Sequence, residues 1–256
     1  MKRFALTLGL ILASSTGIAA DTLAERFEKR YLGWSDFCAI LDLTVTSRSG
    51  GQRQGQAEAC VLREGDEVGY LRAKVLAPVG AKGIEIISHV KQGENRKQWL
   101  YSPATKRATP VNDSRAESPF MGTDLSYVDL GVNLMDPKEM KKTGEADCDG
   151  KACVAYDIEP REGEYRRQAW LIEASGALHR VDIFDGDKQI KRMQLGKETQ
   201  SEEGFWLPSS VTVENLRTGS KTELRYQKVD FNQGHEAARY DPDKLYGTGG
   251  TRAPGK

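Results

Sequence analysis

The sequence predicts a mainly β protein (α+β): a strongly curved antiparallel half-barrel of roughly a dozen strands, covered by short helices. Apolar and polar residues alternate over most of the chain, and turn residues separate the alternating runs at a steady spacing. No second run of long helices follows, which excludes alternating strand–helix units. A sheet with so many strands cannot stay flat, so it must curl into a barrel or into a half-barrel closed by helices.

The strands of the first half are expected from alternation that begins at Ile40, where Leu41 and Leu43 flank Asp42. Glycine and proline residues between the runs supply the turns. The expected strands span residues 40–46, 54–62, 70–76 and 84–90, with two shorter strands between 98 and 110. This rhythm is typical of an up-and-down meander.

The same rhythm resumes after a central stretch without regular alternation. Turns are expected at Ser175-Gly176 and at Asp185-Gly186-Asp187, where Gly and Asp favour turn conformations. The expected strands span residues 154–158, 166–172, 178–184, 189–195, 206–213 and 222–231. The two halves together supply the strands of one large sheet.

One amphipathic helix of about three turns is expected at residues 22–32. Thr22 and Glu25 have the spacing of a capping box, and Gly33 supplies a stop. Leu23, Phe27 and Tyr31 recur at helical spacing, so one face is apolar and needs a partner. The sheet that follows can cover that face.

The first 20 residues have the pattern of a secretory signal peptide. Lys2 and Arg3 precede an apolar run from Phe4 to Ala13, and small residues lead up to Ala20. Cleavage is expected before Asp21 or one residue earlier. A membrane anchor is the alternative, but the apolar run is about half the ~20 residues that a spanning helix needs. We therefore expect an exported protein.

Length and composition limit the number of domains in the mature chain and the kinds of partner it can bind. Removal of residues 1–20 from the 256 leaves 236, enough for one domain at residues 21–245 ahead of a loose, Gly-rich and basic tail at 246–256. The mature chain has 35 basic and 37 acidic side chains without a basic stripe, so nucleic acid is a poor partner. No later segment is apolar enough to span a membrane, so we expect peripheral or transient membrane contact at most.

Four cysteines, Cys38, Cys60, Cys148 and Cys153, lie in the exported part. An even number in an oxidising compartment favours disulfides, and three pairings are possible. Spacing favours Cys38–Cys60 together with Cys148–Cys153, which would clip a hairpin whose turn is Asp149-Gly150-Lys151. A metal site is the alternative, but these cysteines lack CxxC spacing and nearby histidines.

The central stretch carries a resemblance to a known family. It contains QWLYSPATKR at residues 98–107 and PFMGTDLSYVDL at 119–130. These motifs resemble the signature of bacterial LolA-like outer-membrane lipoprotein-sorting protein homologues, a periplasmic family often encoded near RND-type (MMPL-like) transporters. The matching residues are Gln98, Trp99, Leu100, Tyr101, Pro103, Phe120, Gly122, Asp124, Tyr127, Asp129 and Leu130. Val128 departs from the family's usual acidic residue.

The resemblance continues through RRQAWLI at residues 166–172 and FWLPSSVTVEN at 205–215, and it ends near FNQG at 231–234. It implies a LolA/LolB-like fold, a periplasmic location, and binding of lipid or lipoprotein acyl chains without chemical conversion. It also makes an RND-type transporter a possible partner.

Two groups of side chains are candidates for the cavity of such a carrier. Trp99, Tyr101 and Trp170 are expected in its wall, because each lies on a strand face with another large apolar residue. A loop and a short helix from Asp124 to Leu130 are expected to cover it. This cover would contribute Phe120, Met121, Leu125, Tyr127 and Leu130.

The residues of the cover have competing interpretations. Phe120 and Met121 either form a flexible lid, for which Met is well suited, or plug the core beneath a loop. Asp124 is expected to cap the helix rather than to act in catalysis. Tyr127 either lines the cavity or pins the lid through its hydroxyl group.

No catalytic constellation can be assembled from the sequence. His89, His179 and His235 are isolated, and the chain has no HExxH, GxSxG, P-loop or GxGxxG motif. We therefore expect a non-enzymatic carrier without a cofactor. The alternative is an accessory subunit that docks on an RND-type transporter and carries nothing.

Overall fold

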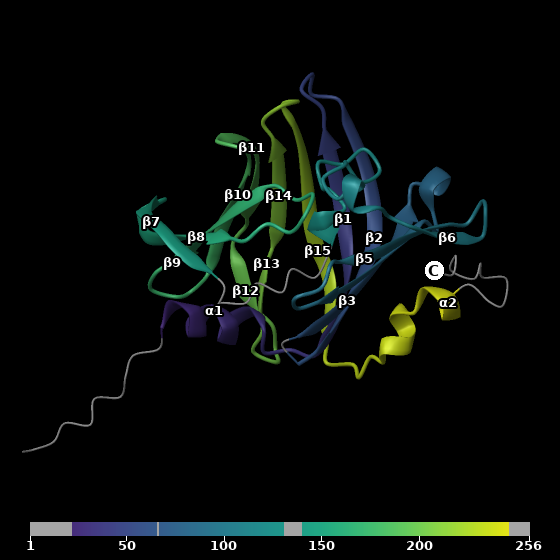
Figure 1. Cartoon of the computed structure of the whole chain (residues 1–256), viewed down its shortest axis with the longest axis horizontal. Coiled ribbons are helices and arrows are strands. Elements are labelled where there is room, and N and C mark those ends of the chain that lie inside the picture. The colour runs from purple at the N-terminus through teal and green to yellow at the C-terminus, as the bar shows by residue number, and fades with distance from the viewer. Residues whose placement is uncertain (1–21, 66, 131–139, 246–256) are drawn as a thin grey trace, which may run out of the picture.

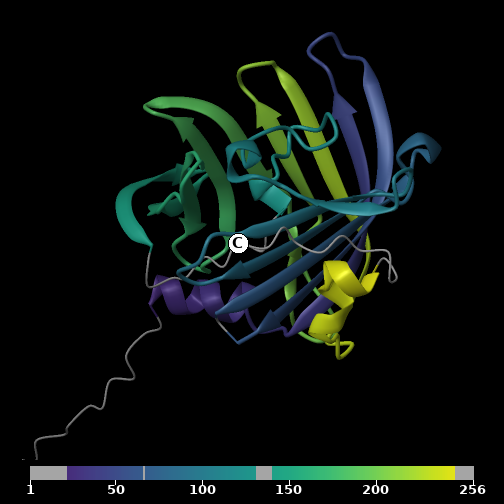
Figure 2. The same cartoon turned by 45° about the vertical axis from the view of Figure 1, so that its right-hand side comes forward.

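The computed structural model describes residues 22–65, 67–130 and 140–245. The signal peptide and the tail expected at 1–20 and 246–256 lie outside these residues. Thirteen strands form one antiparallel sheet that bends strongly, and its two end strands do not pair with each other (Figures 1 and 2). The predicted fold class, a strongly curved antiparallel sheet of about a dozen strands, is thus confirmed.

The strand order across the sheet is β6-β5-β4-β3-β2-β1-β15-β14-β11-β10-β9-β8-β7, and a separate hairpin contains β12 and β13. The strands are β1 (Asp36–Thr46), β2 (Gln52–Glu64), β3 (Val68–Ala77), β4 (Glu85–Lys91), β5 (Lys97–Ser102), β6 (Arg107–Pro110), β7 (Lys141–Cys148), β8 (Lys151–Ile158), β9 (Arg166–Ile172), β10 (Leu178–Asp185), β11 (Lys188–Leu195), β12 (Glu198–Gln200), β13 (Trp206–Pro208), β14 (Ser210–Asn215) and β15 (Ser220–Phe231). The helical segments are α1 (Leu23–Tyr31), α2 (Pro242–Leu245) and the 3-10 turns η1 (Val79–Ala81), η2 (Asp113–Arg115), η3 (Val128–Leu130) and η4 (Ala237–Tyr240).

The connection from β6 to β7 joins the two edge strands of the sheet. Its described part, residues 111–130, is called the strap here. The strap lies inside the bend of the sheet, in front of β1 and β15 (Figures 1 and 2). A long meander of this order leaves its two edges on opposite arms, and the strap lies across the open side between them.

The N-terminal helix forms where its caps predict. The Thr22 backbone N–H donates to the Glu25 carboxylate at 2.7 Å, and the Glu25 N–H donates to the Thr22 hydroxyl at 3.2 Å, which completes the capping box. Phe27 is buried. The Arg30 guanidinium and the Tyr31 hydroxyl both contact the Glu198 carboxylate of β12. These contacts hold α1 against the β12–β13 hairpin.

The two disulfides favoured by the spacing are both present, Cys38–Cys60 and Cys148–Cys153. The first joins directly opposed residues of β1 and β2, and the second closes the β7–β8 hairpin. Tyr240 of η4 is fully buried against Cys60 and Leu62. The C-terminal segment is thereby fixed to β2 near the first disulfide.

Candidate functional site

A cavity of about 750 Å³ lies between the strap and the inner faces of the central strands. Most of its lining is aliphatic, because alternate residues of each strand point to the same face. The strand residues include Leu41, Leu43 and Val45 of β1, Ala57 and Ala59 of β2, Leu71, Ala73 and Val75 of β3, and Leu224 and Tyr226 of β15. Burial raises the pKa of the Tyr226 phenol, so this group stays neutral.

The space exists because one row of the sheet has very small side chains. Ala39 of β1 is directly opposite Ala59 of β2, which is in turn opposite Ala73 of β3. The row then continues into Ile86 and Leu100. Three methyl groups side by side cannot reach the strap, whereas larger side chains at these positions would fill the interior. The sequence therefore leaves a hollow where a closed core could have formed.

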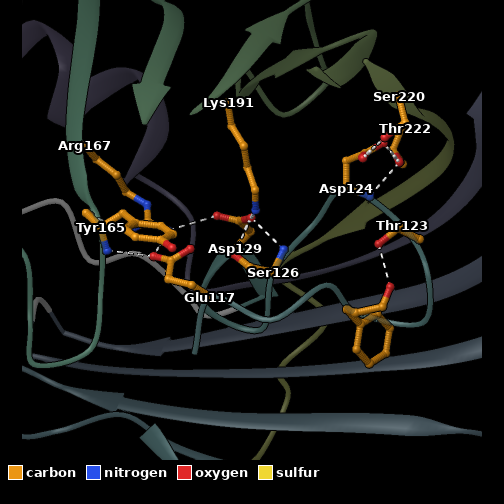
Figure 3. Close-up of polar contacts among 11 residues, drawn as sticks. Glu117, Thr123, Asp124, Ser126, Asp129, Tyr165, Arg167, Lys191, Ser220 and Thr222 are labelled. Atoms are coloured by element: carbon orange, nitrogen blue, oxygen red, sulfur yellow. Dashed lines mark hydrogen bonds and ion pairs between the residues drawn. The ribbon is translucent and has the colours of Figure 1, made fainter. Parts of the chain in front are cut away.

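The strap is fixed on one side by a buried ionic network (Figure 3). The Asp129 carboxylate lies 3.3 Å from the Arg167 guanidinium of β9 and 3.6 Å from the Lys191 ammonium of β11. It also accepts hydrogen bonds of 2.7 Å from the backbone N–H and the hydroxyl of Ser126. Burial opposes the charge of Asp129, but the two cations and the Ser126 donors outweigh it and lower its pKa.

Glu117 extends this network within the strap. Its carboxylate accepts hydrogen bonds of 2.9 Å from the Arg167 guanidinium and from the Tyr165 backbone N–H (Figure 3). Arg167 thus bridges two carboxylates of the strap. This arrangement holds the strap to the arm of the sheet that contains β9 and β11.

A second anchor joins the strap to β15. The Asp124 carboxylate accepts hydrogen bonds from the hydroxyls of Ser220 and Thr222, and the Asp124 N–H donates to the Thr222 hydroxyl at 2.9 Å (Figure 3). This corrects the expectation that Asp124 caps a helix from Leu125 to Leu130. The segment forms a tight turn and then the short 3-10 turn η3, because the buried bond to β15 replaces the local cap.

On the opposite arm, hydrogen bonds and apolar contacts hold the strap. Gln98 of β5 donates a hydrogen bond of 2.8 Å to the Tyr127 carbonyl. Arg53 of β2 donates one of 2.6 Å to the Gly122 carbonyl. Phe120 packs on Ile86 and on the Tyr127 ring. The strap is therefore bonded to both arms of the half-barrel and forms one wall of the cavity.

The structure brings four of the predicted cover residues together on the cavity: Phe120, Met121, Leu125 and Leu130. Phe120 is buried, whereas Met121 is 38% exposed at the opening. Tyr127 packs behind Phe120, and its hydroxyl accepts a hydrogen bond from Arg115 at 3.3 Å. A role of these residues in holding a ligand stays a prediction.

The three aromatic residues expected in the wall lie elsewhere, which corrects that expectation. Leu100, between Trp99 and Tyr101, packs with the residues beneath the strap, so its two neighbours point to the convex face. Trp99 there contacts the His89 ring. Trp170 is on the convex face of β9, beneath the Arg180 guanidinium at 4.4 Å. Neighbouring residues of a strand point to opposite faces of the sheet, and the sequence alone does not show which of the two faces is the inner one.

Arg167 and Lys191 were not identified from the sequence. Each stands in an ordinary strand pattern, and its partner Asp129 lies far away along the chain. The signal that could have found them is the buried charge of Asp129 itself. A buried carboxylate that faces a sheet needs cations near it. Lys and Arg side chains at inward-pointing positions of the strands can supply them.

Within the parts of the chain that the structure describes, no three His, Cys, Asp or Glu side chains gather as a metal site would require. Helices in the same residues are all too short or too polar to cross a bilayer.

A family model described as "-like: Uncharacterized protein" matches residues 72–246, more than half of the chain. The chain belongs to this family. No curated protein gives a significant match.

Solved structures establish the fold. A protein described as an outer membrane lipoprotein-sorting protein domain from Vibrio parahaemolyticus has a TM-score of 0.80 at 20% identity, covering 88% of this chain and 97% of its own. A DUF1329 family protein from Desulfovibrio piger has a TM-score of 0.76 at 21% identity and covers 86% and 94%. A LolA superfamily protein from Nitrosomonas europaea has a TM-score of 0.64 at 13% identity and covers 89% and 98%. The predicted LolA-like resemblance is confirmed in the fold.

Proposed function

We propose that this protein is a periplasmic carrier that binds a lipid, or the acyl chains of a lipoprotein, in the cavity beneath the strap. The observation that carries this proposal is the unfilled, largely aliphatic space of about 750 Å³. This volume lies in the range of small-molecule sites. The fold, shared with a lipoprotein-sorting domain, supports the same function.

The lining suits hydrocarbon better than a polar ligand. Each methylene group that moves from water into such a space contributes about 0.8 kcal/mol. Charged residues border the cavity at few points among the described residues, namely Arg53, Lys74 and Asp129. Asp129 is neutralised by Arg167 and Lys191, and Lys74 is 3.5 Å from the Glu85 carboxylate. An acyl chain can therefore enter without leaving buried charges unpaired.

The chemistry of the site supports binding rather than catalysis. His89 bonds the Tyr240 carbonyl at 2.8 Å, His235 bonds the Tyr240 hydroxyl at 2.9 Å, and His179 lies 3.6 Å from the Asp149 carboxylate. None of the three lines the cavity. An acid–base pair facing a bound substrate is what an enzyme would need here. We therefore assign the chain a carrier role without a cofactor.

The periplasmic location rests on two features. Both disulfides close in the fold, which favours an oxidising compartment. The N-terminal sequence has the pattern of a signal peptide. A non-carrier subunit of an RND-type transporter is the alternative, but a subunit of that kind has no need for a hollow interior.

The test combines lipid analysis with a variant that fills the cavity. Protein purified from periplasm is examined by native mass spectrometry, and bound lipid is extracted. Ala59→Phe places a ring in the centre of the alanine row, and Ala146→Phe makes the same change at an exposed position of edge strand β7. We expect lipid on the parent protein and on Ala146→Phe, and its loss from Ala59→Phe. Reproducible absence of lipid from the parent, or equal loading of both variants, contradicts the proposal.

A further inference from the structure

Four separate segments lie at the end of the half-barrel where exposed residues line the cavity, and together they are called the rim. They are residues 46–54 at the β1–β2 turn, 78–83 around η1, 103–107 at the β5–β6 turn, and 120–123 of the strap. Arg53, Pro78, Ala81 and Met121 line the cavity. Because Arg53, Pro78 and Met121 are also exposed, the cavity opens on this side. Gly83 lies against the Pro103 ring, so the β5–β6 turn adjoins η1, as Figure 2 shows.

The rim is strongly cationic in a chain without net charge. It contains Arg48, Arg53, Lys82, Lys106 and Arg107, and no Asp or Glu, although the whole chain has 37 basic and 37 acidic residues. All five cations are exposed. Arg53 donates to the Gly122 carbonyl, while the other four form no ion pair with any residue that the structure describes. The charge of the rim is thus available to an external partner.

The rim also exposes apolar side chains. Val79 is 89% exposed and Met121 38% exposed, and these are two of the three large apolar residues that stand out on the described surface. The third, Leu216, is in the β14–β15 turn. Apolar tips within a ring of Lys and Arg are typical of surfaces that lie in the interface of a lipid bilayer. Cations contact the anionic headgroups while the apolar side chains enter below them.

We propose that the rim is a docking surface for an anionic lipid bilayer. The cations bind headgroup phosphates, and Val79 and Met121 enter the boundary between headgroups and acyl chains. The opening of the cavity then faces the membrane, and hydrocarbon can pass between the two without crossing water. Docking depends on the rim and not on cargo, so it can be tested separately from the proposed carrier function.

The experiment measures flotation of the full mature chain with vesicles of phosphatidylcholine, with or without phosphatidylglycerol, at low and high salt. Each cation near an anionic surface contributes about five-fold to binding, so Lys82→Gln/Lys106→Gln should reduce it by about 25-fold. The matched control Lys151→Gln/Lys188→Gln makes the same charge change at the exposed first residues of β8 and β11. Val79→Ser tests the apolar contribution at a side chain that packs on little else.

Binding that requires phosphatidylglycerol, weakens in salt and falls in both rim variants but not in the control supports the proposal. Failure to float with anionic vesicles, or equal binding by rim and control variants, overturns it. Docking on a transporter instead would appear as rim-dependent crosslinking to that protein without vesicle binding, and it also overturns the proposal. Uptake of a fluorescent fatty acid is measured on the same variants, so a failed carrier function is recognised separately.

Discussion

The Lys191 ammonium of β11 lies 3.6 Å from the Asp129 carboxylate of the strap, and Asp129 has 2% of its side chain exposed. The same carboxylate faces Arg167 of β9. One strap residue therefore compensates two cations on the inner face of the sheet. The strap cannot lift as a whole without exposing this buried group of charges, so it is a permanent part of the fold.

Asp129→Asn tests this relationship. The amide has nearly the shape of the carboxylate but leaves Lys191 buried without a counter-charge and Arg167 with Glu117 as its remaining carboxylate partner. Removing one partner of a buried ion pair costs about 3–5 kcal/mol, and we expect the free energy of unfolding in urea to fall by that amount. Asp113→Asn, at an exposed position of the same strap, is the control. A loss no larger than that of the control would show that the network does not hold the strap.

His89 is expected to make the free energy of unfolding depend on pH in the acid range. Its Nε2–H donates to the Tyr240 carbonyl, and its ring lies between those of Tyr70 and Trp99. Burial lowers the pKa of His89 below its usual value near 6.5, although the Tyr240 bond acts the other way. The folded state therefore binds this proton less readily than the unfolded state. The contribution of neutral His89 to the free energy of unfolding is fully present above pH 6.5. It is lost as the pH falls from 6.5 through the lowered pKa.

His89→Gln is expected to weaken this pH dependence. The Gln amide can still donate to the Tyr240 carbonyl but does not titrate. Urea unfolding of both proteins across the acid range measures the slope. Near-equal stability above neutral pH shows that the substitution preserves packing. An unchanged slope in His89→Gln would assign the acid response to other groups.

Local and long-range contacts explain which features could be predicted. Alternation at residues 40–46 and the Thr22–Glu25 capping box act between neighbours, and both appear as expected. The capping pattern at Asp124 is equally local, but the bond to Thr222, 98 residues away, overrides it. A short strand is predicted to begin at Gln98 and β5 forms there, yet its inner face contains Leu100 rather than Trp99. Which face lies inside depends on how the whole sheet bends.

The positive charge of the rim could not be predicted from the sequence either, because it also depends on long-range contacts. Its cations come from three of its four segments, residues 46–54, 78–83 and 103–107, and each of these three has one or two of them. The sequence has no basic stripe, because the cations of the rim are far apart along the chain and only the fold brings them together. The alanine row at residues 39, 59 and 73 is likewise visible only once strand register is known.

Phe120 and Met121 are expected to behave differently when each is replaced by Ser. Phe120 is buried on Ile86 and Tyr127, so its loss should cost about 3–5 kcal/mol of unfolding free energy. Met121 is partly exposed at the opening, so Met121→Ser should stay within about 0.5 kcal/mol of the parent. Its effect should appear instead as weaker retention of a fluorescent fatty acid. Equal stability losses in the two variants would make both residues core plugs.

Arg53 is expected to control how fast a bound acyl chain leaves. Its guanidinium holds the Gly122 carbonyl at 2.6 Å, where the strap meets the rim. Arg53→Met keeps most of the side-chain length but removes the donor. A hydrogen bond from a charged group contributes about 1.5 kcal/mol at the lower end of its range, so release of a fluorescent fatty acid should accelerate about ten-fold in stopped-flow measurements. Arg48→Met, in the same hairpin but beside Gly219, is the matched control and should leave the rate unchanged. Equal rates in Arg53→Met and the parent would mean that the ligand leaves by a route that the strap tip does not restrict.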